Sequence, residues 1–312
     1  MNKIFKTFKK IFLALMLVLI VLITSGYIYL YKIPKGPELT EVRTLKTKSD
    51  SFVMHAYKNS ERKSIKVWTY KPENWKNRDR ILFVMHGGGR NADDYLDAWK
   101  EISEKNNVLV IVPEFENKFS KYTTNDYQEG NLFTFFGSRN PKEEWAYQVI
   151  ENIFDQIKKT NSITNENYNI FGHSAGGQFV HRMIMLMPEA RIENAIAANA
   201  GFYTLPEEDL EYPYGLKNTP ITDSSIKESF TKKLTILLGE NDNDPNLETF
   251  RETELAMQQG KHRLERGSNF YKRANTMAKE RLWNFNWEID TIQNVGHNYR
   301  EMSSQAINYI AN

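Results

Sequence analysis

A serine between two glycines is the residue of this chain best suited to act as a nucleophile. Residues 172–176 read Gly-His-Ser-Ala-Gly, after an apolar run at 167–171 and before a stretch of helical apolar spacing at 177–187. Gly-x-Ser-x-Gly between a strand and a helix predicts a sharp turn, because small neighbours let the backbone fold without a side-chain clash. The hydroxyl of Ser174 then projects clear of the backbone. An ordinary glycine-rich turn is the alternative.

A serine hydroxyl needs a base that accepts its proton, and the chain contains six histidines. His297 follows the last predicted strand, 287–292, and a glycine precedes it, which suits a loop that lays the imidazole over the serine. The other five histidines fit the role less well. His173 lies beside the serine, and His181 lies too far along the helix that follows it. His55 and His86 belong to early strand and loop positions, and His262 belongs to a charged segment. We therefore predict His297 as the base.

An acid that orients the histidine is expected between serine and histidine, on the loop after the penultimate strand, 234–238. That loop contains three carboxylates, Glu240, Asp242 and Asp244. We predict Asp242 as the acid, with Asp244 second and Glu240 third. The remaining carboxylates are expected to serve the turn, since Asx residues and Pro245 stabilise turns. A calcium-binding loop is a further alternative, although Asp-x-Asp here lacks the remaining ligand spacing.

A glycine-rich loop after an early strand, 81–85, is suited to stabilise negative charge in a reaction intermediate. Residues 86–89 read His-Gly-Gly-Gly. Glycines at this position let backbone N–H groups approach an oxyanion closely. We predict the backbone N–H groups of Gly88 and Ala175 as the two donors. A plain glycine turn between strand and helix is the alternative.

The N-terminus predicts a transmembrane or signal helix. Lysines precede the run 11–31, which has no charged residue and matches the roughly 20 residues needed to cross a bilayer. Basic residues on the N-terminal side predict that the rest of the chain lies outside the cytoplasm. A cleaved signal peptide is the alternative, but residues 24–26 offer no good Ala-x-Ala site, so an uncleaved membrane anchor is favoured. If the segment is cleaved, the protein is secreted.

The remaining sequence predicts one large α/β domain. Continuous apolar strands alternate with amphipathic helices, which indicates a mostly parallel sheet with helices on both faces. The predicted division is an anchor or signal segment (1–31), a linker (32–50) and a catalytic domain (51–312). One strand is expected to end at Pro113.

The composition excludes several classes of function. The chain has 312 residues, a net charge of +2 and no cysteine. Without cysteine there are no disulfides, no thiolate metal sites and no cysteine nucleophile. The charge balance gives no case for a nucleic-acid partner. We expect no metal site.

These parts together resemble the α/β-hydrolase superfamily, over nearly all of the chain after residue 50. Within it the chain resembles secreted esterases related to polyhydroxyalkanoate depolymerases and feruloyl esterases. The motifs that carry the resemblance are the stretch His86–Ala92, the His-Ser-Ala-Gly elbow and an aspartate three positions after Gly239, which supports Asp242 over Asp244. A long acid-to-histidine segment, with a charged insert at 252–281 that is expected to be helical, departs from it. The resemblance implies no cofactor.

The expected function is therefore that of a membrane-anchored, extracytoplasmic serine esterase that acts through an acyl-enzyme on a small-molecule or polymer ester. A serine peptidase of the same fold is one alternative, and a catalytically inactive member acting as a surface binding protein is another. Two aromatic-rich stretches, 115–141 and 203–229, are candidate lids or substrate walls, and ordinary anchoring of loops by their aromatic side chains is the alternative. Fold alone does not choose among short esters, hydroxyalkanoate oligomers, acylated sugars and peptides.

Overall fold

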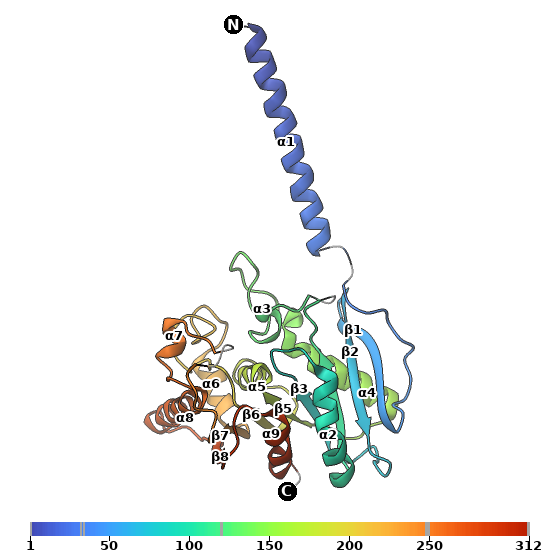
Figure 1. Ribbon diagram of the computed structural model, residues 1–312, viewed down its shortest axis with the longest axis vertical. Helices are drawn as coiled ribbons and strands as arrows, with labels where there is room; N and C mark the ends of the chain where they lie inside the picture. Colours follow the sequence, from blue (N-terminus) through green and yellow to red (C-terminus); the bar gives the residue numbers. More distant parts are fainter. Residues whose placement is uncertain (1, 32, 34, 119–120, 247–249, 311–312) are drawn as a thin grey trace.

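The computed structural model describes residues 2–31, 33, 35–118, 121–246 and 250–310. An eight-stranded sheet forms the centre of the molecule (Figure 1). Its strands are β1 (Lys48–Tyr57), β2 (Ser60–Lys71), β3 (Ile81–Met85), β4 (Leu109–Glu114), β5 (Tyr168–His173), β6 (Ile192–Ala198), β7 (Leu234–Gly239) and β8 (Glu288–Ile292). Their order in the sheet is β1-β2-β4-β3-β5-β6-β7-β8. The β1–β2 and β2–β4 pairs are antiparallel, and every later pair is parallel.

Helices cover both faces of this sheet (Figure 1). The helices of the chain are α1 (Asn2–Tyr31), which lies apart from the sheet, and α2 (Ala92–Asn106), α3 (Thr124–Tyr127), α4 (Ala146–Asn161), α5 (Ala175–Leu186), α6 (Asp223–Phe230), α7 (Glu254–Met257), α8 (Arg263–Glu280) and α9 (Tyr299–Ala306). Single 3₁₀ turns precede α4 at Lys142–Glu144 and follow α9 at Ile307–Tyr309. Helices α2 and α9 pack together on one face, and α4, α5 and α8 pack on the other. The predicted α/β architecture is confirmed.

Side chains of the central strands alternate between two cores. Phe83 and Ile170 face the core under α4 and α5, whereas Leu82, Val84 and Phe171 face the core under α2 and α9. Strands β3, β5 and β7 are therefore buried along their whole length. Burial on both faces explains why these strands are continuous apolar runs in the sequence.

The prediction that a strand ends at Pro113 is wrong. Strand β4 continues to Glu114, and Pro113 pairs with Val67 of β2. On its other side, β4 pairs with β3 up to the Phe83–Ile111 pair. Pro113 therefore lies beyond the end of the β3–β4 pairing. On that side β3 needs no hydrogen bond from its backbone, so the missing N–H of proline costs little.

Helix α1 projects from the domain (Figure 1). Within the described residues it is the one helix long and apolar enough to cross a membrane, at Ile4–Tyr29, and none of that stretch is buried. Such a helix at the N-terminus fits either a membrane anchor or a signal sequence. The chain after it lies against the β1–β2 hairpin. There Lys35 forms a bridge with Lys63, and the backbone N–H of Thr40 donates to the carbonyl of Val53 over 3.2 Å.

Candidate active site

Ser174 occupies the sharp turn between β5 and α5. Its backbone has φ 57° and ψ −113°, a conformation that L residues rarely adopt. The N–H of Ser174 donates to the carbonyl of Ala198 over 2.9 Å, and its carbonyl accepts from the N–H of Gln178 over 3.0 Å. The surrounding sheet and the first turn of α5 thus hold the strained serine in place.

Close backbone contacts explain the two glycines that flank this turn. A Cβ atom on Gly172 would lie 2.2 Å from the carbonyl oxygen of Gly176. A Cβ atom on Gly176 would lie 2.1 Å from the carbonyl oxygen of Met85, at the end of β3. Both distances are far below van der Waals contact, so neither position has room for a side chain. The start of α5 is therefore pressed directly against β3.

His297 and Asp242, predicted as base and acid, are hydrogen-bonded to each other. The distance from Nδ1 of His297 to Oδ2 of Asp242 is 2.7 Å. Asp242 follows β7 and is buried, whereas the side chain of His297, between β8 and α9, is 24% exposed. Because a carboxylate only accepts, Nδ1 carries the proton. Nε2 is then the nitrogen that can accept a proton from a nucleophile.

The two competing carboxylates of this loop have other contacts. Asp244 is exposed, and its Oδ1 accepts the backbone N–H of Asn246 over 2.9 Å, an Asx turn. Glu240 accepts the backbone N–H of Asn294 over 2.8 Å. Within the part of the chain that the structure describes, no group of three or more His, Asp or Glu side chains is arranged to hold a metal ion.

Arg263 is a member of this site that the sequence analysis missed. It begins α8, in the charged insert, and its Nη1 lies 3.4 Å from Oδ1 of Asp242. Both side chains are almost fully buried, at 2% and 1% exposure. A buried carboxylate requires a compensating charge, and Arg263 supplies it. The sequence shows only a basic run here, and nothing in it signals burial.

His173 connects the serine turn with the predicted base. Its ring centroid lies 4.5 Å from that of His297, and its Nδ1 lies 3.1 Å from the hydroxyl oxygen of Tyr95. Tyr95 stacks on Tyr299, with centroids 4.3 Å apart. Burial lowers the pKa of His173 well below its ordinary value, and the nearby imidazole of His297 lowers it further whenever it carries a proton on both nitrogens. His173 is therefore a neutral packing partner in this cluster.

The glycine-rich loop after β3 is anchored by His86. Its Nδ1 donates to the carbonyl of Gly87 over 3.0 Å, and its Nε2 accepts the backbone N–H of Phe115 over 3.1 Å. Burial lowers the pKa of His86 to about 3, so the ring is neutral. A Cβ atom on Gly87 would lie 2.8 Å from the hydroxyl of Tyr95 and 3.9 Å from Cβ of Ser174. The loop therefore lies next to the serine turn.

The two predicted oxyanion donors lie on either side of this contact. Ala175 is the first residue of α5, so the helix itself does not use its N–H. Gly88 is exposed, and a Cβ atom there would meet no described atom within 4 Å. Their joint role in binding an oxyanion stays a prediction.

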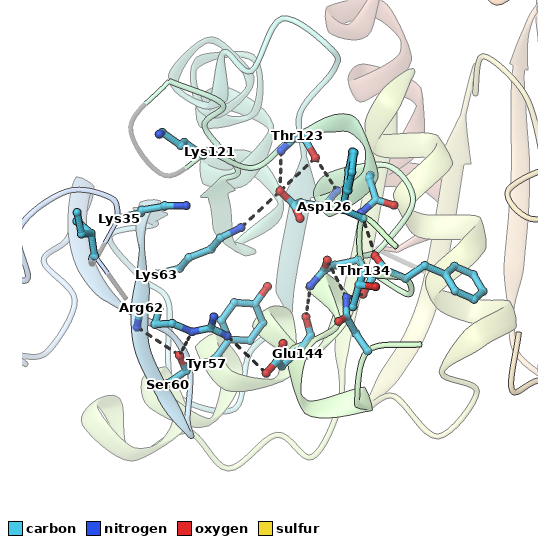
Figure 2. Close-up of a pocket in the computed structure, with 16 residues that line it drawn as sticks. Lys35, Tyr57, Ser60, Arg62, Lys63, Lys121, Thr123, Asp126, Thr134 and Glu144 are labelled. Atoms are coloured by element: carbon cyan, nitrogen blue, oxygen red, sulfur yellow. Dashed lines mark hydrogen bonds and ion pairs between the residues drawn. The ribbon is translucent and has the colours of Figure 1, made fainter. Parts of the chain in front are cut away.

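A separate cavity of about 630 Å³ lies away from these residues (Figure 2). Its walls come from the segment after α1, from the β1–β2 hairpin and from residues 121–144. None of the predicted catalytic residues lines it. A ligand in this cavity would therefore not contact Ser174, Asp242 or His297.

Comparison with solved structures finds hydrolases. A poly(aspartic acid) hydrolase-1 from Sphingomonas sp. KT-1 has a TM-score of 0.82 and 40% identity, over 86% of this chain and 100% of that chain. LpqC, a poly(3-hydroxybutyrate) depolymerase from Bordetella parapertussis, has a TM-score of 0.78 and 27% identity, over 83% and 88%. The siderophore hydrolase EstA from Aspergillus nidulans, at 0.51 and 13% over 85% and 94%, shows the shared fold alone. No protein-family model and no curated protein matches the chain.

Proposed function

The chain belongs to the α/β-hydrolase superfamily, and from this premise we propose that it is a serine hydrolase with Ser174, Asp242 and His297 as its catalytic triad. The observation that carries the proposal is the 2.7 Å hydrogen bond between Asp242 and the Nδ1 atom of His297. The strained turn at Ser174 supports it, because this backbone conformation exposes a nucleophile at the end of a strand.

The proposed reaction proceeds through an acyl-enzyme. Oγ of Ser174 attacks the substrate carbonyl carbon while Nε2 of His297 takes the hydroxyl proton. Asp242 holds the Nδ1 proton and stabilises the imidazolium that forms. The N–H groups of Gly88 and Ala175 donate to the oxyanion. The imidazolium then protonates the leaving group, and a water molecule, deprotonated by the imidazole, hydrolyses the acyl-enzyme.

We propose a carboxylic ester as the substrate, as a small molecule or a polymer. The similarity to a poly(3-hydroxybutyrate) depolymerase supports this, because that polymer is linked by ester bonds. A second candidate is amide hydrolysis in an acidic polymer. The 40% identity with a poly(aspartic acid) hydrolase favours it, because poly(aspartic acid) is linked by amide bonds.

We also propose that α1 is an uncleaved anchor and that the catalytic domain lies outside the cytoplasm. The exposed apolar stretch Ile4–Tyr29 supports the anchor. The lysines at the N-terminal end of this stretch support the orientation. Mass spectrometry of the N-terminus of the protein purified from membranes tests the anchor. A mature chain beginning near Gly26 would contradict it.

A fluorophosphonate probe tests the catalytic proposal on the full chain in detergent. We expect the wild-type protein to be labelled and to hydrolyse nitrophenyl esters, and Ser174→Ala to lose both, with a fall in kcat of at least about 1,000-fold. Ser268→Ala, which changes an exposed serine on α8, is the matched control and should keep both activities. A folded wild-type protein that neither labels nor turns over would instead favour an inactive binding protein.

The choice between ester and amide needs its own comparison. Values of kcat/KM are measured on oligomers of 3-hydroxybutyrate and on oligomers of aspartic acid, each with the wild type and with Ser174→Ala. Faster Ser174-dependent cleavage of the ester oligomer supports the first substrate class. Faster cleavage of the amide oligomer replaces it with the second.

A further inference from the structure

Two adjacent phenylalanines at the tip of a hairpin point into solvent. Phe135 is 93% exposed and Phe136 is 84% exposed, and their rings meet edge to face with centroids 5.4 Å apart. Single exposed apolar residues are ordinary, but a pair of aromatic rings on a projecting tip is a feature of surfaces that bind another apolar phase.

The backbone at the base of this hairpin is held by hydrogen bonds and by one ring contact. Phe133 and Arg139 form a bridge, and the N–H of Thr134 donates to the carbonyl of Ser138 over 2.7 Å. The N–H of Gly137 donates back to the carbonyl of Thr134 over 2.9 Å. The ring of Phe133 lies 5.7 Å from that of Tyr212 and holds the hairpin on the domain. These contacts fix the backbone of the hairpin that carries the two exposed rings.

The hairpin lies on the same side of the domain as the end of α1. In Figure 1 the loop that follows α3 rises toward this helix. Ile33 and Lys35, just after α1, line the same cavity as Phe133 and Phe135. The ammonium group of Lys121 lies 3.7 Å from the ring centroid of Tyr29, which is part of α1. A membrane crossed by α1 would therefore face the hairpin and these lysines.

Positive charge gathers on this face. Four basic side chains line the cavity: Lys35, Arg62, Lys63 and Lys121 (Figure 2). Among the residues that the structure describes, two carboxylates also line the cavity: Asp126 lies 3.4 Å from Lys63 and Glu144 lies 3.5 Å from Arg62. Burial lowers the pKa of Lys35, and the nearby charge of Lys63 lowers it further. An anionic phosphate at this face would relieve that crowding of cations.

We propose that Phe135, Phe136, Lys35 and Lys121 form a membrane-docking surface that holds the catalytic domain against the bilayer crossed by α1. The two rings enter the boundary between headgroups and acyl chains, and the lysines meet the phosphates of anionic lipids. The inference rests on the proposed membrane anchor. It does not depend on the assignment of the catalytic triad.

The absence of cysteine makes a direct test possible. Phe135→Cys in the full chain gives a single labelling site for an environment-sensitive dye. Leu282→Cys is the matched control, because this residue is also 93% exposed and follows α8, a helix that lies away from α1 in Figure 1. Both proteins are reconstituted in vesicles of phosphatidylcholine with phosphatidylglycerol, some of them carrying nitroxide-labelled acyl chains.

We expect nitroxide lipids to quench the dye at position 135 at least about threefold more than the dye at position 282. We also expect aqueous iodide to quench position 135 less. Equal quenching by iodide at both positions would overturn the proposal. The exposed rings would then be expected to bind a protein partner or a substrate instead of lipid. In vesicles without phosphatidylglycerol, quenching at position 135 should weaken. Adding Lys35→Gln and Lys121→Gln should remove that lipid dependence, and a dependence that survives would overturn the role of the lysines.

Two controls separate failure of docking from failure of the earlier proposals. Mass spectrometry of the reconstituted chain shows whether α1 is present before the dye is read. Turnover of a soluble nitrophenyl ester reports the triad and should be equal in the dye-labelled variants and the wild type. Loss of lipid quenching with α1 present and turnover intact would overturn the docking surface alone.

Discussion

The serine turn and the projecting hairpin obtain their geometry in opposite ways. Around Ser174 every residue of α5 is buried, and the flanking glycines leave no room for a Cβ atom. At the hairpin tip, Phe135 and Phe136 stand almost entirely in solvent. The serine turn is strained and held by dense packing, whereas the hairpin presents side chains that the fold does not need. Substitutions should therefore impair folding and catalysis together in the first region, and neither in the second.

The largest effect is expected from Gly176→Ala. The added methyl group would lie 2.1 Å from the carbonyl oxygen of Met85, so α5 must move away from β3. We expect a loss of at least about 3 kcal/mol in the free energy of unfolding, together with loss of fluorophosphonate labelling. Gly88→Ala is the control, because its methyl group meets no described atom within 4 Å and the N–H is retained. Equal unfolding temperatures for the two variants would contradict the packing argument.

Asp242→Asn should come next. The amide no longer stabilises the imidazolium of His297, and we expect kcat on nitrophenyl esters to fall by about 1,000- to 10,000-fold. Asp244→Asn changes an exposed turn residue of the same loop and should leave kcat within about twofold. Steady-state kinetics decide between them. A comparable loss in both variants would remove the distinction between the two aspartates.

Acid should destabilise the packed region through its buried histidines. The pKa of His86 is lowered to about 3 and that of His181 lies well below its ordinary value, both chiefly through burial. In each ring Nε2 accepts a backbone N–H, from Phe115 and Thr204, which a protonated ring cannot do. Below about pH 6.5 the unfolded chain binds protons that the folded chain excludes.

Their contribution to stability is therefore fully present above about pH 6.5 and falls as the pH drops toward the lowered folded pKa. Each histidine should cost about 1.4 kcal/mol per pH unit in that range. Denaturant unfolding at pH 7, 6 and 5 measures this slope. A free energy of unfolding that stays constant over this range would show that the two rings are not held neutral.

The smallest effect is expected at the hairpin tip. Phe136→Ser should change the free energy of unfolding by no more than about 0.5 kcal/mol, because the ring has little to pack against. Turnover of soluble esters should also be unchanged. Phe133→Ser, at the base, removes the ring that lies 5.7 Å from Tyr212, and should lower the unfolding temperature. If the tip variant were the more destabilised of the two, the comparison of the regions would fail.

The features predictable from the sequence are those encoded by neighbouring residues. The apolar strands, the glycine-flanked serine and the aspartate after β7 all depend on local spacing, so the fold and the Asp242–His297 pair could be anticipated. Arg263 could not, because its burial depends on where α8 packs against a loop 21 positions earlier. The contact of Tyr95 with His173 spans 78 positions and is equally invisible. The end of β4 was also not predictable. A strand can contain Pro113 because the neighbouring β3 stops pairing before that residue, which the local sequence does not show.

Helix α1 has 30 residues, which corresponds to a length of about 45 Å, and the domain begins almost at its end. Lys35, already in contact with Lys63, follows Tyr31 by four positions, which gives a tether of at most about 14 Å. In the anchored form that we propose, the enzyme cannot search the medium for its substrate. Hydrolysis is then confined to a thin shell around the cell, and a substrate molecule is cleaved only after it has reached that shell.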